Sequence, residues 1–437
     1  MTDDNGPSVS EALYERAKQV LPGGVSRNTV LRAPHPLYAA HATGCRITDV
    51  DGVERIDFAN NMASLIHGHA HPAIVAAVTD QMARGTAYTM ATEAEIRYAE
   101  HLCSRNAGFD QLRFVNSGTE AVMATLKVSR AFTGRPKIAK VEGAYHGSYD
   151  FAEVSQTAEP ANWGGVDAPE SVPVAHGTPR GVLDDVVVLP FNDVERAVQI
   201  LNGHANDIAC VLVDLMPHRV GLCPATQAFV DALRSWTTAN GALLVADEVI
   251  TFRGCYGGAQ QGYGIQPDLT AMAKMIGGGF PVGAIAGRRD VMQVMNPHSD
   301  DYRVPHSGTF SANPITMTAG RTAMELFDQE AVERLNGLNR MAIEGINEAI
   351  GRRGVEASVS GAGSLFQIHM TSPSPINYRD AYPDPEAATR LARFVALLLD
   401  DGILMVSSGT GILSTPMGEG EIDQLVAAVD RALAGLG

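Results

Sequence analysis

The stretch from residue 247 to 283, DEVITFRGCYGGAQQGYGIQPDLTAMAKMIGGGFPVG, decides how the rest of the chain is interpreted. The apolar run 242–246 ends at Asp247, and a second apolar run, 269–272, is soon followed by Lys274 and three consecutive glycines. Short apolar runs bounded by turn residues are typical of buried strands in a parallel sheet. Because the carboxyl ends of such strands meet along one edge, we expect Asp247 and Lys274 to converge there.

A carboxylate and a lysine at one sheet edge suit the chemistry of pyridoxal phosphate. The lysine amine forms a Schiff base with the aldehyde of that cofactor. The carboxylate keeps the pyridine nitrogen protonated, so that the ring can draw electrons from a substrate carbanion. Taken singly, the two residues are better explained as a surface lysine and an aspartate at a helix start, and the rest of the chain has to decide.

Composition restricts the class of protein. The chain has 437 residues, of which 45% are apolar and 19% charged, as expected for a globular protein with two or more domains. The formal net charge of −16 argues against nucleic acid or an anionic membrane as the main partner. No apolar run approaches the roughly 18 residues of a membrane helix, and the first ten residues are too polar for a signal peptide.

The cysteines indicate the compartment. They number five, an odd count, and none forms a CxxC pair, which argues against a disulfide framework or a zinc site. The cysteines are Cys45, Cys103, Cys210, Cys223 and Cys255. A reducing cytoplasm fits this usage, and we predict a soluble cytoplasmic protein.

The order of apolar patterns predicts an α/β fold. Strands alternating with helices between about residues 112 and 272 indicate a large, mainly parallel sheet, which we assign to a domain of residues 72–316. Residues 317–437 turn mainly helical with a few short strands, as in a smaller α+β domain. The N-terminal segment 1–71 is expected to join the small domain and the active site, and the aperiodic segment 152–182 is expected to form a lid.

Two turns after strands are candidates for ligand contacts. A strand at 112–115 runs into Ser117-Gly118-Thr119 and then a helix, and such a turn offers free N–H groups and hydroxyls to a phosphate. A second strand, 137–141, is followed by a turn containing Tyr145 and His146. The tyrosine can stack on a flat ring or simply close the turn.

The N-terminal segment carries two further candidates, each with a simpler alternative. The loop 23–32 holds two arginines and no acid, which is either a solvated surface or a grip for an anion. His67, His69 and His71 form an HxHxH run that could bind a metal or could cap the helix expected to start near Pro72. No later cluster of residues supplies the missing metal ligands.

The succession of these motifs resembles the class III aminotransferases of the fold type I pyridoxal-phosphate group, and within them the glutamate-1-semialdehyde aminomutase branch. The similar stretches cover about residues 21–320, whereas the tail 321–437 is similar only in outline. They are LPGGVS, DVDG, GHAHP, RFVNSGTEAVMA, FTGRPKI, EGAYHG, DEVITFR, PDLTAMAK, IGGGFPVGAIAGRRDVM and SGTFSANPI.

The resemblance implies a role for each residue of the site. Lys274 would bind the cofactor and move a proton between the substrate carbon and the cofactor. Asp247 would pair with the pyridinium nitrogen, while Tyr145 and Val249 would cover the two ring faces. Thr309 would reach the phosphate of a second subunit, which implies a homodimer. The remaining residues placed at the cofactor are Ser117, Gly118, Thr119 and His146, and no metal is implied.

Several positions depart from the family pattern and bear on the substrate. Asp214-Leu215 replaces a Glu-Pro pair, and His218 and Arg219 stand where small or amide residues are usual. Met62 replaces an aromatic residue that often lines the substrate pocket. The tail segment 407–411, SSGTG, is shorter than the glutamate-containing segment of the aminomutase. It also lacks the second arginine that β-amino-acid transaminases often have there.

The loop holding Ser26-Arg27 resembles that of β-amino-acid transaminases, in which this arginine binds the substrate carboxylate. We therefore expect an aminotransferase that moves the amino group of a β- or otherwise unusual amino acid to a keto acid by a ping-pong mechanism. Arg27, Met62 and Arg219 are its expected substrate-binding residues. The alternatives are an aminomutase or epimerase with the same cofactor, a metal-dependent hydrolase built on the three histidines, and a non-catalytic binding protein. For Arg219 the alternative is a salt bridge to Asp214 or a place on a solvated loop.

Overall fold

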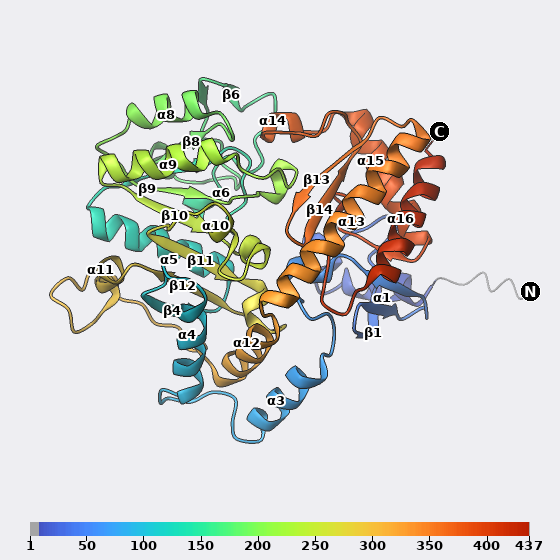
Figure 1. The fold of residues 1–437 in the computed structure, drawn as a ribbon, viewed down its shortest axis with the longest axis horizontal. Coiled ribbons are helices and arrows are strands. Elements are labelled where there is room, and N and C mark those ends of the chain that lie inside the picture. Colours follow the sequence, from blue (N-terminus) through green and yellow to red (C-terminus); the bar gives the residue numbers. More distant parts are fainter. Residues whose placement is uncertain (1–7, 437) are drawn as a thin grey trace, which may run out of the picture.

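A computed structural model describes residues 8–436, and a seven-stranded sheet forms its centre (Figure 1). In sheet order the strands are β4 (Gln111–Val115), β12 (Gly283–Gly287), β11 (Leu269–Ala273), β10 (Leu243–Asp247), β9 (Ile208–Val213), β5 (Lys137–Val141) and β8 (Val186–Leu189). The five strands from β11 to β8 run parallel, and β12 runs antiparallel to both of its neighbours. The predicted α/β fold is therefore confirmed.

Helices cover both faces of this sheet. Helix α5 (Gly118–Thr133) packs on one face, against β9 to β12, while α8 (Val194–Asn202) and α9 (Gln227–Asn240) pack on the other. Alternate residues of β9 enter the two opposite cores, so every residue of the strand is buried. Burial on both sides explains the continuous apolar sequence, IACVLV, that identifies this strand.

Two smaller sheets lie beside the large one. One joins β1 (Ala39–Thr43), β2 (Arg46–Asp49), β3 (Glu54–Asp57) and β15 (Ile403–Leu404), and the other joins β13 (Ser358–Ala362), β14 (Leu365–His369) and β16 (Thr410–Ile412). Helices α13 (Gln329–Arg353), α15 (Pro385–Asp400) and α16 (Glu419–Ala434) stand side by side in this region (Figure 1). The parallel pairing of β15 with β3 joins the N-terminal segment to the C-terminal region.

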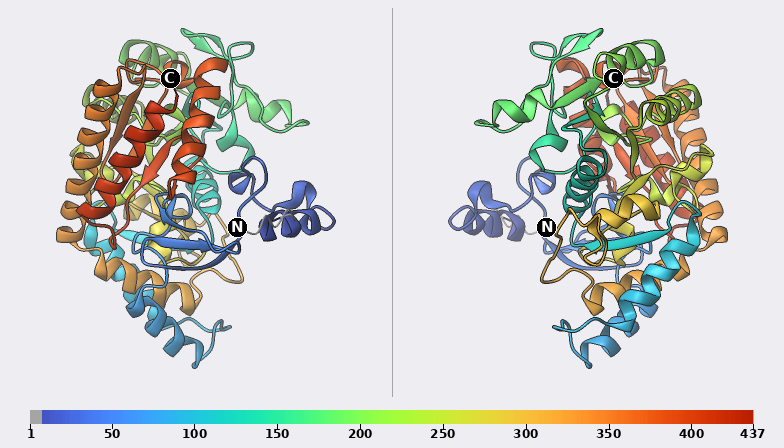
Figure 2. Two further views of the ribbon diagram at one scale, coloured as in Figure 1. Left: turned by 90° about the vertical axis from the view of Figure 1, so that its right-hand side faces the viewer. Right: turned by 90° about the vertical axis from the view of Figure 1, so that its left-hand side faces the viewer.

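Three longer helices lie near the N-terminus, and the second begins at Pro72 as predicted. They are α1 (Val9–Ala17), α3 (Pro72–Met82) and α4 (Glu93–Arg105), and α12 (Pro314–Leu326) packs against the last two. Figure 2 shows α1 projecting from the body of the molecule. Within residues 8–436, none of the helices combines the length and the apolar character needed to span a membrane.

The segment predicted as a lid, 152–182, has some structure of its own. It contains the end of α6 (Asp150–Glu153), a two-stranded hairpin of β6 (Gly164–Gly165) and β7 (Ala168–Pro169), and the start of α7 (Arg180–Asp184). Figure 2 shows this region extending from the body above α1.

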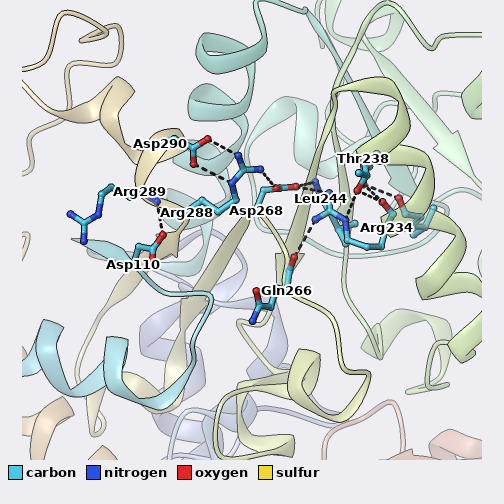
Figure 3. A network of polar contacts seen from close by, with 11 residues as sticks. Asp110, Arg234, Thr238, Leu244, Gln266, Asp268, Arg288, Arg289 and Asp290 are labelled. Carbon is cyan, nitrogen blue, oxygen red and sulfur yellow. Dashed lines mark hydrogen bonds and ion pairs between the residues drawn. The ribbon is translucent and has the colours of Figure 1, made fainter.

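A polar network fixes the end of the large sheet that lies away from Lys274 (Figure 3). Asp268, just before β11, is buried and accepts a hydrogen bond from Leu244 N at 2.7 Å. Its two carboxylate oxygens also pair with Arg288 at 2.5 Å and with Arg234 at 3.0 Å. The network ties β10 to β11 and to the residue after β12, and so sets the register that brings Asp247 opposite Ala271.

Candidate active site

A cavity of about 560 Å³ opens at the carboxyl ends of the central strands. Asp247 is the last residue of β10, and Lys274 follows the last residue of β11. Nine of the predicted site residues line this cavity. They are Arg27, Ser117, Gly118, Thr119, Tyr145, His146, Asp247, Val249 and Lys274.

Asp247 is buried and held by two donors. Val249 N donates to Oδ1 at 3.0 Å, and Nδ1 of His146 lies 2.7 Å from Oδ2. Burial lowers the pKa of His146, although Asp247 opposes that shift. A neutral His146 that donates from Nδ1 fixes the carboxylate while leaving part of it facing the cavity.

Asp214 lies at the end of the neighbouring strand β9, next to Asp247. Burial, and then the charge of Asp247, raise the pKa of Asp214 well above its usual range. Met216 N donates to Asp214 Oδ1 at 2.9 Å. This shift favours the protonated form of Asp214 and so reduces the negative charge beside Asp247.

Lys274 begins the turn after β11 with φ of 53°, in the left-handed region that non-glycine residues rarely adopt. Burial lowers the pKa of its amine to about 8, while Asp247 and Asp214 act in the opposite direction. A lysine with this pKa is partly neutral near physiological pH, which is the form that attacks a carbonyl carbon.

The N-terminus of α5 forms one wall of the cavity. Ser117 caps the helix, since its Oγ accepts from Glu120 N at 3.1 Å. A Cβ on Gly118 would lie 3.0 Å from the Val249 side chain, and a Cβ on Gly147 would lie 2.6 Å from Thr119 Oγ1. The free N–H groups of this first turn, approached closely because of the glycines, suit a phosphate.

Tyr145 lines the same cavity and packs against His218, whose ring centroid is 5.5 Å away at an angle of 71°. Burial lowers the pKa of His218 to about 3, so its ring is neutral. Arg219 is exposed and lies outside the cavity lining, with its guanidinium carbon 5.4 Å from the centroid of the Tyr145 ring. It donates a hydrogen bond to the carbonyl of Gln156 at 3.4 Å.

The other predicted site residues lie at the edge of the site or outside it. Arg27 lines the first cavity and also a neighbouring cavity of about 610 Å³, which contains Met62. Thr309 is exposed and does not line the cavity of its own chain. Its predicted contact with a second subunit stays a prediction.

The HxHxH run makes structural contacts. Both ring nitrogens of His67 are engaged, one with Thr415 Oγ1 and one with the carbonyl of Ala323, each at 2.8 Å. His69 Nε2 lies 2.8 Å from Asp57 Oδ2. Within residues 8–436 no group of three or more His, Cys, Asp or Glu side chains is placed to hold a metal ion.

Two parts of the site were not predicted from the sequence. Arg27 donates a hydrogen bond to Asn61. Arg379, from the C-terminal region, binds Glu142, which precedes Tyr145 in the sequence. An asparagine pair in the stretch FANNMAS was a usable sign of a left-handed turn, because asparagine tolerates that conformation. The contact between Arg379 and Glu142 joins positions 237 apart in sequence and leaves no local pattern.

Comparison with known proteins identifies the family. Residues 29–429 match the family described as Aminotransferase class-III. The chain belongs to the class-III aminotransferases. A curated relative, glutamate-1-semialdehyde 2,1-aminomutase of Methanothermobacter thermautotrophicus, is 40% identical over 373 residues, which are 85% of this chain and 86% of the relative.

Solved structures agree with this class-III assignment. An omega-transaminase from Sphaerobacter thermophilus is 47% identical with a TM-score of 0.96, and the match covers 98% of each chain. A β-phenylalanine aminotransferase from Variovorax paradoxus is 34% identical with a TM-score of 0.86, over 98% of this chain and 94% of that one.

Pyridoxal 5'-phosphate is the cofactor of this enzyme, as in the class-III family. The cavity fits it in three respects. A helix N-terminus offers donors for a phosphate, a buried carboxylate is available for a ring nitrogen, and a lysine with a lowered pKa is available for an aldehyde.

Proposed function

We propose that this aminotransferase takes its amino group from a β-amino acid, or a related unusual amino acid, and transfers it to a keto acid in two half-reactions. The observation that carries the proposal is the position of Arg27, which lines the same cavity as Lys274 and Asp247. An arginine is the preferred partner of a carboxylate, because its planar fork can donate two parallel hydrogen bonds. The similarity to a β-phenylalanine aminotransferase supports the same substrate class.

Each residue of the cavity has its own role in the proposed reaction. When bound, the cofactor supplies an aldehyde for the substrate amine and a ring that withdraws electrons from the substrate carbon. Lys274 holds and returns the proton at that carbon. Asp247, supported by His146, keeps a proton on the ring nitrogen, and Tyr145 and Val249 cover the ring.

The phosphate is held by the first turn of α5 together with Ser117 and Thr119. We extend the proposal to a homodimer, in which Thr309 donates to the phosphate of the partner's site. Its exposure in the single chain is compatible with that role. A cytoplasmic location and the domain boundaries at residues 71 and 316 also stay predictions.

The substrate of each half-reaction carries a carboxylate. Arg27 is proposed to bind the carboxylate of the amino donor. Arg219 is the candidate for the acceptor, because it lies against the outer side of Tyr145 and has no carboxylate within ion-pair distance in the described part of the chain. The tail segment 407–411 offers no arginine for this purpose.

The second candidate function is an aminomutase that moves an amino group within one molecule. The 40% identity to a glutamate-1-semialdehyde 2,1-aminomutase favours it. The departures at Met62 and in segment 407–411 favour the transaminase instead, since they alter the positions that surround the substrate in the aminomutase branch.

The Arg27→Ala variant tests the proposed function. It should lower kcat/KM for β-amino acid donors by an amount equivalent to about 2–5 kcal/mol, the range for removing one partner of a desolvated charge pair. Amines without a carboxylate should react as they do with the unaltered enzyme. Equal losses for both kinds of donor would show that Arg27 does not bind the carboxylate. Arg219→Ala should slow only the half-reaction with the keto acid.

A further inference from the structure

Residues 60–63 form a left-handed turn without any glycine. The φ angles are 44° for Asn60, 45° for Asn61, 59° for Met62 and 73° for Ala63. Each is in a region where the Cβ of an L-residue is crowded, and four in succession are unusual. Such a conformation persists only when its surroundings impose it, and it occurs most often at functional sites.

The fold imposes this turn through buried hydrogen bonds. Asp57, at the end of β3, accepts from the N–H groups of Ala59 and Asn60, both at 2.9 Å, through Oδ1. Its Oδ2 contacts His69, at 2.8 Å. The Asn60 side chain donates to the carbonyl of Ile412 in β16 at 2.6 Å, so the turn is anchored from both of the smaller sheets.

The turn presents Asn61 at the junction of the two cavities, and both cavities are lined by Asn61 and Arg27. Asn61 Oδ1 accepts a hydrogen bond from Nη1 of Arg27 at 2.7 Å. The Asn61 amide is oriented by Ser64, whose Oγ donates to the Asn61 carbonyl and accepts from Asn61 Nδ2, both at 2.9 Å. Only the amide oxygen can therefore face Arg27.

We propose that Asn61 is a positioning residue that holds the guanidinium of Arg27 at the mouth of the cavity, ready for a substrate carboxylate. This inference rests on the proposed function, because it assumes a donor whose carboxylate Arg27 binds. An unrestrained arginine on a surface loop loses much rotamer freedom when it binds a ligand, and an arginine already held does not. One N–H group is used by Asn61, and the others stay available for a bidentate contact.

The test is the binding of 3-phenylpropanoate to the holoenzyme, measured by titration calorimetry. This ligand keeps the ring and the carboxylate of β-phenylalanine but lacks the amine, so no reaction accompanies binding. Asn61→Gly removes the side chain while tolerating the left-handed backbone. We expect its Kd to rise about fivefold, the effect of roughly 1 kcal/mol.

Ala63→Gly is the matched control, since it loosens the same turn without touching either cavity lining. It should leave the Kd unchanged. In an Arg27→Ala background, Asn61→Gly should have no further effect, because the two side chains act through one contact. Cofactor absorbance should be the same in all variants, which shows that the site itself is intact.

Three results would overturn the inference. They are an unchanged Kd in Asn61→Gly, an equal rise in Ala63→Gly, and an additive loss in the double variant. Failure of the proposed function looks different: in that case Arg27→Ala itself binds the carboxylate as well as the unaltered enzyme does, or the unaltered enzyme does not bind it.

Discussion

Lys274 owes its reactivity to its surroundings. Burial lowers the pKa of its amine to about 8. Asp247 and the neighbouring Asp214 oppose this shift only in part. Burial and the charge of Asp247 raise the pKa of Asp214, which weakens its attraction for the ammonium form of Lys274. Burial thus outweighs the two carboxyl groups and leaves the lysine partly neutral near neutral pH.

The pH dependence of cofactor attachment tests this description of Lys274. Only the neutral amine attacks the aldehyde, so the rate at which the apoenzyme takes up pyridoxal phosphate covalently should rise with pH. Because the pKa is lowered, the rise should reach its midpoint near pH 8 rather than near the 10.5 of an ordinary lysine. Stopped-flow absorbance measures this rate, and a midpoint above pH 10 would contradict the assignment.

The Asp247→Asn variant tests the role of the Asp247 carboxylate. An amide cannot keep the ring nitrogen protonated, so the ring becomes a poor acceptor of electrons. We expect turnover to fall by about a hundredfold or more, as for other preorganised charges in active sites. Cofactor content should be retained, because Lys274 and the first turn of α5 are unaltered. Near-normal turnover in a fully loaded variant would refute the role.

At the scale of elements, a short C-terminal helix fixes the turn that carries Tyr145. Arg379, in α14 (Tyr378–Ala381), binds both carboxylate oxygens of Glu142 at 2.9 Å and also donates to the carbonyls of Trp163 and Gly164 at 3.1 Å. Glu142 directly follows β5 and is buried. The helix therefore joins the β6–β7 hairpin to the end of a central strand.

Arg379→Ala should destabilise the protein by about 3 kcal/mol in urea unfolding, because it leaves Glu142 buried without its partner. Limited proteolysis should also cut the β6–β7 region faster. Arg180→Ala is the control, since its ion pair with Asp184 is exposed on both sides and contributes little. Equal stability of the two variants would show that the contact with Glu142 is unimportant.

At the scale of the whole molecule, the sequence predicts what burial and local conformation dictate. Strands β10 and β11 were predicted from their apolar runs, because burial on both faces favours continuous apolar residues. Strand β12, with the sequence GAIAG, was not predicted, because its glycines and alanines lack the side chains typical of strands. It sits where a larger residue would collide, as a Cβ on Gly283 would lie 2.1 Å from the carbonyl of Ser117.

In the candidate site, too, the features that a local sequence pattern indicates differ from those that it does not. Residues next to a strand end or helix start, such as Asp247, Lys274 and Ser117, line one cavity, and their roles stay predictions. Arg219 lies 5.4 Å from the centroid of the Tyr145 ring and does not line the cavity, so its proposed role stays a prediction. The contact of Asn61 with Arg27 depends on a strained turn held by distant strands, and no periodicity in the sequence reports such a constraint.

Intermolecular amino transfer can be tested by the yield of keto product from β-phenylalanine when the holoenzyme is given no keto acid. A transaminase retains the amino group on its cofactor after one half-reaction, so we predict one equivalent of product per active site, with a matching change in cofactor absorbance. Adding a keto acid should restore the absorbance and start turnover. Continued conversion of an amino substrate without any acceptor would contradict the account and favour a mutase or epimerase.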